Sequence, residues 1–224
     1  MNKKELKLTI CAQKETDLAR CLRENGYEFF NETSVEKAIL TAEEGSGVAI
    51  LADTHPVPSI VVPGELLEKA RKKNLRLYVE FPKEIGNDSF GEPQPAEYER
   101  VVCNSGFFGE NLPQDTILMI NGCYYLDAGK REALLSLAKV AGYDRIVFGM
   151  PEKHVPILFF YDENVMVSTT ALSNFITARH APVREIGGMW KSLLLWLTGY
   201  VLHLTWEPTV GVAYSKEEKL PENY

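Results

Sequence analysis

The stretch ILMINGCYYLDAG, residues 117–129, places a cysteine directly after an apolar run, where a strand-to-helix turn could hold a nucleophile. Such an elbow needs small residues two positions before and after the nucleophile, and a helix that begins at once. Asn121 and Tyr125 occupy those positions around Cys123, and the expected helix has its N-cap only at Asp127. The thiol therefore lacks the helix N-terminus that would lower its pKa, and we predict that Cys123 is not a catalytic nucleophile.

A hydrolase or amidotransferase that used Cys123 would also need a general base within hydrogen-bond reach. His180 follows it along the chain, but no acidic residue stands two positions later to orient the imidazole. His55 lies beside Asp53, directly after a predicted strand, and is the more suggestive histidine. Cys123, His55 and His180 are thus the candidate catalytic residues of an alternative function, and we assign a catalytic role to none of them.

The composition argues against several other classes of function. The chain has 224 residues, 45% of them apolar, which suits one folded domain with a sizeable core. Its formal net charge of −7 disfavours nucleic acid as a partner, because nucleic acid attracts clustered cations. The four cysteines show neither C-x-x-C spacing nor a histidine at metal-ligand intervals, so we expect no metal and no cofactor.

The elements that must position these side chains alternate between strand and helix. Apolar runs predict strands at 6–11, 27–30, 48–52, 75–81, 100–103, 116–120 and 145–148, and helical spacing predicts helices at 16–25, 33–45, 65–73 and 128–141. Residues 157–160 and 165–168 predict an added antiparallel hairpin, and 82–95 an exposed loop. Repeated strand–helix–strand units predict an α/β fold with a mostly parallel sheet covered on both faces.

Residues 190–204 predict a final helix that is apolar on more than one side. Its uncharged core, 192–202, is shorter than the roughly 20 residues that a membrane-spanning helix needs, so we expect no membrane span. Contact with the sheet on one side and with a partner on the other explains the pattern; the partner is a downstream catalytic module or a second copy of the chain. Residues 206–224 lack a strong period and indicate a linker or tail towards a further domain.

A ligand crevice is expected beyond the carboxyl ends of the strands, as in other open parallel sheets. The candidate lining residues are Asp53, His55, Asn104, Cys123, Tyr124 and Arg179. Their polar groups suit the hydroxyls of a sugar, and an aromatic ring suits its apolar face. A carbohydrate is therefore a candidate ligand.

The segments ILMINGCYYLDAGKREALLSLAKVAGYDRIVFG and PILFFYDENVMVSTTALSNFITARHAP, followed by WKSLLLWLTG, resemble the class I glutamine-amidotransferase-like domains. The similarity covers about residues 5–205 and is greatest to the non-catalytic members attached to bacterial glycoside hydrolases, including the trimerisation domain of some β-galactosidases. It implies a three-layer flavodoxin-like sandwich over 1–205. Active amidotransferases carry G-x-C-x-G and a downstream H-x-E, whereas this chain has N-G-C-Y-Y and no H-x-E.

The resemblance implies an accessory or interaction domain of a carbohydrate-active protein, without glutaminase activity of its own. Two alternatives stay open: a hydrolase or amidotransferase that uses Cys123, and a sugar-binding sensor that uses the crevice. The start, MNKKELKLTI, shows no long apolar run and no cleavage site, so we expect no signal peptide in this chain. A cytoplasmic and a periplasmic location both remain open.

Overall fold

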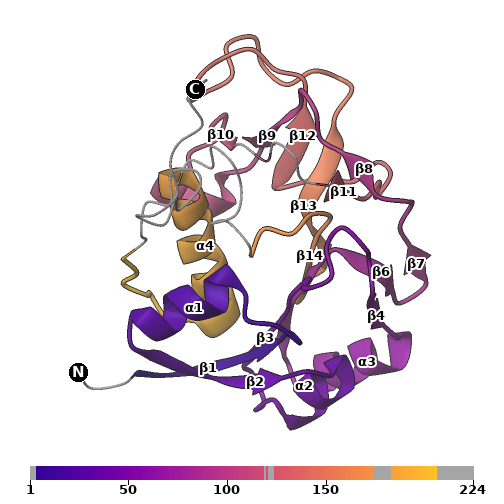
Figure 1. The fold of residues 1–224 in the computed structure, drawn as a ribbon, viewed down its shortest axis with the longest axis vertical. Coiled ribbons are helices and arrows are strands. Elements are labelled where there is room, and N and C mark those ends of the chain that lie inside the picture. Colours follow the sequence, from indigo (N-terminus) through magenta and orange to yellow (C-terminus); the bar gives the residue numbers. More distant parts are fainter. Residues whose placement is uncertain (1–3, 119, 121–123, 174–182, 206–224) are drawn as a thin grey trace, which may run out of the picture.

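The computed structural model describes residues 4–118, 120, 124–173 and 183–205 and is built around one nine-stranded mixed sheet (Figure 1). Its parallel half has the strand order β2 (Tyr27–Glu32), β1 (Lys4–Cys11), β3 (Gly47–Ile50), β5 (Arg76–Glu80) and β14 (Val165–Ser168). Its antiparallel half continues with β13 (Val155–Asp162), β12 (Leu135–Ala138), β9 (Arg100–Cys103) and β10 (Ile117–Leu118). The predicted mixed α/β class and the added hairpin β13–β14 are confirmed.

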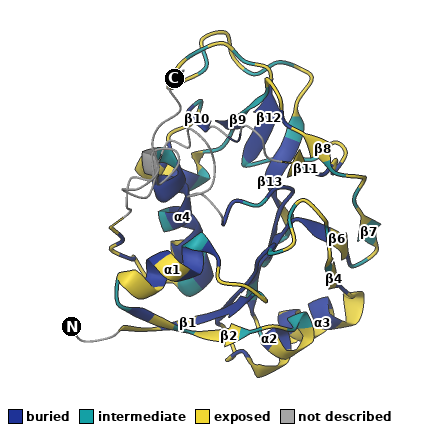
Figure 2. Cartoon of the chain, viewed as in Figure 1, coloured by how far each residue is buried: buried dark blue, intermediate teal, exposed yellow. Residues whose placement is uncertain are grey.

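Helices cover both faces of the parallel half, as Figure 1 shows. On one face lie α1 (Asp17–Glu24) and α4 (Val183–Thr198), and on the other lie α2 (Val35–Thr41) and α3 (Gly64–Lys72). The first pair packs on one apolar cluster, which includes Leu22 and Trp190, and the second pair packs on another, which includes Ile39 and Leu67. Figure 2 shows the buried strands between these two layers of helix. The strands alternate their side chains between the two clusters.

The helix ends follow from local side-chain chemistry. The hydroxyl of Thr16 accepts a hydrogen bond from the backbone N–H of Ala19 at 3.2 Å, which caps α1 at the predicted position. In α2 the cap is Ser34, which accepts from the N–H of Lys37 and lies one residue after Thr33, the start of the predicted helix 33–45. Both residues are good caps, so the one-residue difference depends on which of them adopts the extended backbone before the first turn.

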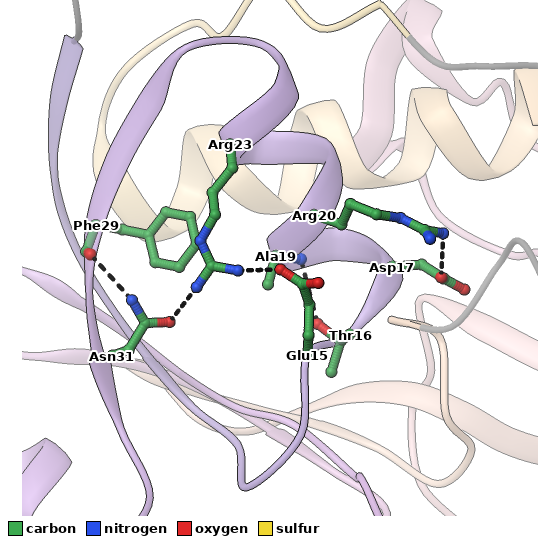
Figure 3. A network of polar contacts seen from close by, with 8 residues as sticks. All are labelled: Glu15, Thr16, Asp17, Ala19, Arg20, Arg23, Phe29 and Asn31. Carbon is green, nitrogen blue, oxygen red and sulfur yellow. Dashed lines mark hydrogen bonds and ion pairs between the residues drawn. The ribbon is translucent and has the colours of Figure 1, made fainter.

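A polar network ties α1 to the edge strand β2 (Figure 3). The guanidinium of Arg23 lies between the carboxylate of Glu15 and the side-chain oxygen of Asn31, and it donates to both. It also stacks 5.0 Å from the centre of the Phe29 ring. The exposed edge of the sheet is therefore flanked by charged and amide side chains, which discourage pairing with a foreign strand.

The largest correction concerns residues 128–141, which were expected to form a helix. Residues 135–138 instead form β12, which pairs with β9 on one side and β13 on the other. All four of its residues are buried, Leu135 and Leu137 on one face and Ser136 and Ala138 on the other, so the helical spacing of the leucines did not distinguish a buried strand from a helix. Asp127 is not a helix cap, because its side chain accepts from the N–H of Gly129 at 2.8 Å in a local turn.

Two further predictions need correction, and one element was not predicted. Residues 82–95 are not only loop, because β6 (Pro82–Ile85) pairs with β4 (Ile60–Val62) and β7 (Asp88–Ser89), and β8 (Gln94–Pro95) pairs with β11 (Tyr124–Tyr125). Residues 145–148 make only isolated bridges, and Phe148 is 87% exposed. A 3₁₀ segment, η1 (Gly106–Asn111), packs against α4.

The final helix α4 begins and ends earlier than the predicted 190–204. It ends at Thr198 and is followed by Gly199, whose φ of 75° is a left-handed conformation that glycine adopts readily. Its inner face is fully buried at Trp190, whereas Leu195 is 41% exposed and Tyr200, just beyond the helix, is 52% exposed. No helix in the described part of the chain is long and apolar enough to cross a membrane.

Candidate functional site

The carboxyl ends of the parallel strands form the candidate site. In the order β2-β1-β3-β5-β14, the chain passes from β1 to β2 on one side and from β3 to β5 on the other, so the strand order reverses between β1 and β3. Open α/β sheets bind ligands at such a switch point. A hollow of about 230 Å³ lies there. Its lining comes from the ends of β1 and β3, the start of α2 and the approach to β4: residues 11–13, Thr33, Val35, Ile50, Leu51, Asp53 and 59–61. The hollow suits only a small ligand.

Asp53 fills the position at which an anionic ligand would be bound. Its Oδ2 accepts hydrogen bonds from the backbone N–H of Gln13 and, at 3.2 Å, from that of Lys14. Both donors belong to the loop between β1 and α1, which is the loop that holds phosphate in nucleotide-binding sheets of this order. Since an internal carboxylate already satisfies these donors, the hollow disfavours phosphate and other anions.

The thiol of Cys11 also lines this hollow, but it is not activated. Burial and, to a smaller extent, the nearby carboxylates of Asp53 and Glu32 raise its pKa to about 11. A thiol with so high a pKa stays protonated at neutral pH and is a poor nucleophile.

His55 and Tyr124, two of the predicted site residues, are in contact. The Nε2 of His55 lies 3.2 Å from the carbonyl oxygen of Tyr124 and 3.4 Å from its backbone nitrogen. Its ring packs 4.8 Å from the ring of Phe81. Burial lowers the pKa of His55, and the contact with the Tyr124 carbonyl offsets only part of this shift. The imidazole is therefore neutral at pH 7 and is held against backbone groups.

Glu80, at the end of β5, was not singled out from the sequence and is the most buried acidic group near the site. One oxygen accepts from the hydroxyl of Tyr78 (3.0 Å) and the N–H of Ser173 (2.8 Å). The other accepts from the N–H of Ala52 (3.0 Å) and the hydroxyl of Ser173 (2.6 Å). An acidic residue inside the apolar run LYVEF was the signal that could have revealed it. Its bonds join three segments, and none points into a hollow.

Asn104 does not join the other predicted crevice residues. From β5 through β14, β13 and β12 to β9 the sheet has one parallel and three antiparallel pairings, so β9 runs opposite to β5. The carboxyl end of β9 thus points away from the edge that carries Asp53, His55 and Tyr124. Asn104 instead donates from Nδ2 to the hydroxyl of Ser136 at 2.6 Å.

Cys123, Arg179 and His180 lie outside the described residues. Within the part of the chain that is described, no thiol or hydroxyl hydrogen-bonds to the imidazole ring of a histidine, as an activated nucleophile would. No group of three His, Cys, Asp or Glu side chains there could hold a metal ion. Around Asp53 and His55 the polar side chains are held by backbone groups of the chain, and the hollow beside Asp53 has room only for a small molecule.

The chain matches no model of a known protein family and no curated protein sequence.

Proposed function

We propose that the chain is an interaction domain without a catalytic site of its own, of the flavodoxin-like, class I glutamine-amidotransferase-like type that accompanies carbohydrate-active enzymes. Two observations support the type. The parallel strands follow the order β2-β1-β3-β5-β14, which is the flavodoxin-like order, and helices cover both faces of this half of the sheet.

The groups at the switch point support the absence of catalysis. Asp53 occupies the anion-binding loop, Cys11 is a protonated thiol, and Glu80 has all its acceptor positions filled by structural donors. Catalytic sites expose a group with a pKa near the working pH to a cleft. The pKa of Cys11 is too high, Glu80 is buried away from solvent, and the Asp53 carboxylate accepts from backbone N–H groups of its own chain.

The observation that carries the proposal is the outward apolar surface at the end of α4. Leu195, Tyr200 and Val201 are 41%, 52% and 71% exposed, and the half-buried Trp196 lies beside Leu195. Residues 192–202 contain no charged side chain, so this surface can approach another protein surface without burying a charge. Covering such a surface contributes on the order of 25 cal/mol per Å² of apolar area before the costs of association.

Light scattering over a concentration series tests docking between copies of the chain. We expect the average mass of the wild type to rise with concentration, and the double variant Leu195→Glu, Tyr200→Glu to stay monomeric. Phe148→Glu is the matched control, since Phe148 is 87% exposed on a loop far along the chain from α4. A wild type that stays monomeric throughout, or a double variant that associates as the wild type does, would contradict docking between copies through this surface.

A further inference from the structure

A second pair of hollows lies away from the switch point, where β9 ends and β12 begins. The first, of about 500 Å³, is lined by Asn104 and Ser105 after β9, by residues 131–134 before β12, by His154 before β13 and by Phe160 of β13. The second, of about 490 Å³, is lined by η1 and by Ser192, Leu195 and Trp196 of α4. Both have the size of small-ligand sites.

Aromatic rings join the two hollows. Phe160 lines the first, and its ring centre lies 5.7 Å from that of Phe107 and 5.7 Å from that of Trp196, both of which line the second. The two contacts hold the ring in place, although 39% of Phe160 is exposed. A fixed and exposed ring can receive an apolar ligand face with little loss of side-chain entropy. We call the first hollow, with these rings beside it, the Phe160 groove.

Polar groups of three kinds surround the exposed ring. Ser105 accepts from the N–H of Phe107 at 3.1 Å, which leaves its hydroxyl hydrogen available to donate. The carboxylate of Glu132 is exposed and, in the described part of the chain, has no ion-pair partner. Asn104 supplies an amide whose buried Oδ1 has no hydrogen-bond donor. Because this oxygen is itself buried, a ligand in the groove could reach it only after the Asn104 side chain rotated, so we assign no ligand contact to it.

We propose that the Phe160 groove binds a neutral saccharide. A pyranose has an apolar face of C–H groups that can stack on Phe160, and its hydroxyls both donate and accept. The hydroxyls can therefore donate to Glu132 and accept from Ser105. Arg131 also lines the groove, but its guanidinium forms an ion pair with Asp88 at 2.7 Å, so the carboxylates of Glu132 and, in the adjoining hollow, Glu110 disfavour an anionic ligand. This site is distinct from the crevice predicted beside His55, and it goes beyond the docking surface at the end of α4.

An NMR titration of the ¹⁵N-labelled chain tests the proposal with glucose, galactose, cellobiose and lactose as probes. At least one of them should give saturable shifts at the amides of Ser105, Glu132 and Phe160. Phe160→Ala should weaken binding by about tenfold, because stacking on the ring is lost. Glu132→Gln should weaken it several-fold, because a charge-assisted hydrogen bond becomes a neutral one. Tyr143→Ala, which removes a ring that is 91% exposed outside the groove, should bind as the wild type does.

Three results would overturn the proposal. One is the absence of saturable shifts with all four sugars. Another is saturable shifts that lie around Asp53 and His55 and do not respond to Phe160→Ala. The third is that adenosine, added as a planar aromatic control, binds and that Phe160→Ala weakens its binding, whereas the sugars do not bind. None of these outcomes bears on light scattering of the α4 variants, so the two proposals can fail independently.

Discussion

The replacement Glu80→Gln tests whether the buried carboxylate of β5 has a structural role. Its two oxygens accept four hydrogen bonds, two from backbone N–H groups and two from hydroxyls. A glutamine side chain has the same shape but presents an NH₂ group in place of one oxygen. Each oxygen faces one backbone N–H and one hydroxyl, so either orientation of the amide sets its NH₂ against a backbone N–H.

The loss of stability in Glu80→Gln comes from the backbone N–H that faces the new NH₂ group. The hydroxyls of Tyr78 and Ser173 can rotate to accept from the amide, but the N–H of Ala52 or of Ser173 loses its acceptor. One unsatisfied buried N–H costs about 1–3 kcal/mol, so Glu80→Gln should lower the free energy of unfolding by that amount. Glu80→Ala leaves both N–H groups unsatisfied and should cost about 2–6 kcal/mol, a large part of the total stability of a domain.

The contribution of Glu80 to the free energy of unfolding should decrease as the pH rises. Burial raises the pKa of Glu80, and the donors from Ser173, Ala52 and Tyr78 offset only part of the shift. A raised pKa means that folding favours the protonated carboxyl, so its contribution to stability is full below the unfolded pKa of about 4.3 and declines as the pH rises through the folded pKa. The difference in unfolding free energy between wild type and Glu80→Gln should therefore narrow as the pH rises from about 4.3.

Urea denaturation followed by tryptophan fluorescence measures these differences. Trp190 is a suitable probe because it is fully buried and its ring lies 5.3 Å from that of Tyr78, which donates to Glu80. The matched control is Glu84→Gln on β6, where the side chain is exposed and the change should stay within about 0.5 kcal/mol. The reasoning is refuted if Glu80→Gln is as stable as Glu84→Gln near pH 4.3, where the contribution of Glu80 is full, or if the difference from the wild type widens as the pH rises.

Three further predictions concern packing, titration and reactivity. Gly188→Ala should lower the free energy of unfolding in urea by about 1–3 kcal/mol, because a Cβ there would meet the backbone carbonyl of Asn111. The control is Gly106→Ala, whose Cβ would face open space, and equal stability of the two variants would contradict the prediction. The pKa of His55 in an NMR titration should lie below 6.5. Because folding then favours the neutral ring, the free energy of unfolding should fall as the pH drops below about 6.5, and it should fall less in His55→Gln. A pKa of His55 above 6.5 would contradict the prediction. Cys123 should react with iodoacetamide no faster than an ordinary exposed thiol of pKa about 8.5, and selective modification near pH 6 would favour the enzyme hypothesis instead.

Much of the parallel half could be predicted from short stretches of sequence. The run 6–11 lies within the observed β1, and the run 75–81 encloses β5 with one further residue at each end. The helix predicted at 16–25 is α1, because a cap at Thr16 and Gly26 after its end enclose the apolar spacing. These signals are local: each cap, stop and apolar period involves residues within a few positions of one another.

The antiparallel half could not be predicted in the same way. Residues 135–138 are buried on both faces of the strand, so the apolar period that separates a strand from a helix is missing and either element fits them. Their backbone groups bond to β9 and β13, which lie about 20 or more residues away in the chain, and no local pattern reports such partners. The reversed direction of β9 follows from these pairings, and it moved Asn104 out of the predicted crevice.

By itself the sequence determined the α/β class, the parallel strands with their covering helices and a final helix too apolar for a single buried face. Only the tertiary structure decided which polar groups meet: Asp53 with the loop after β1, His55 with Tyr124, and Glu80 with donors from three segments. The reason is physical. Helix caps and apolar periods depend on neighbours in the chain, whereas the direction of a strand and the partners of a buried carboxylate depend on groups that are distant in sequence and come together only when the core packs.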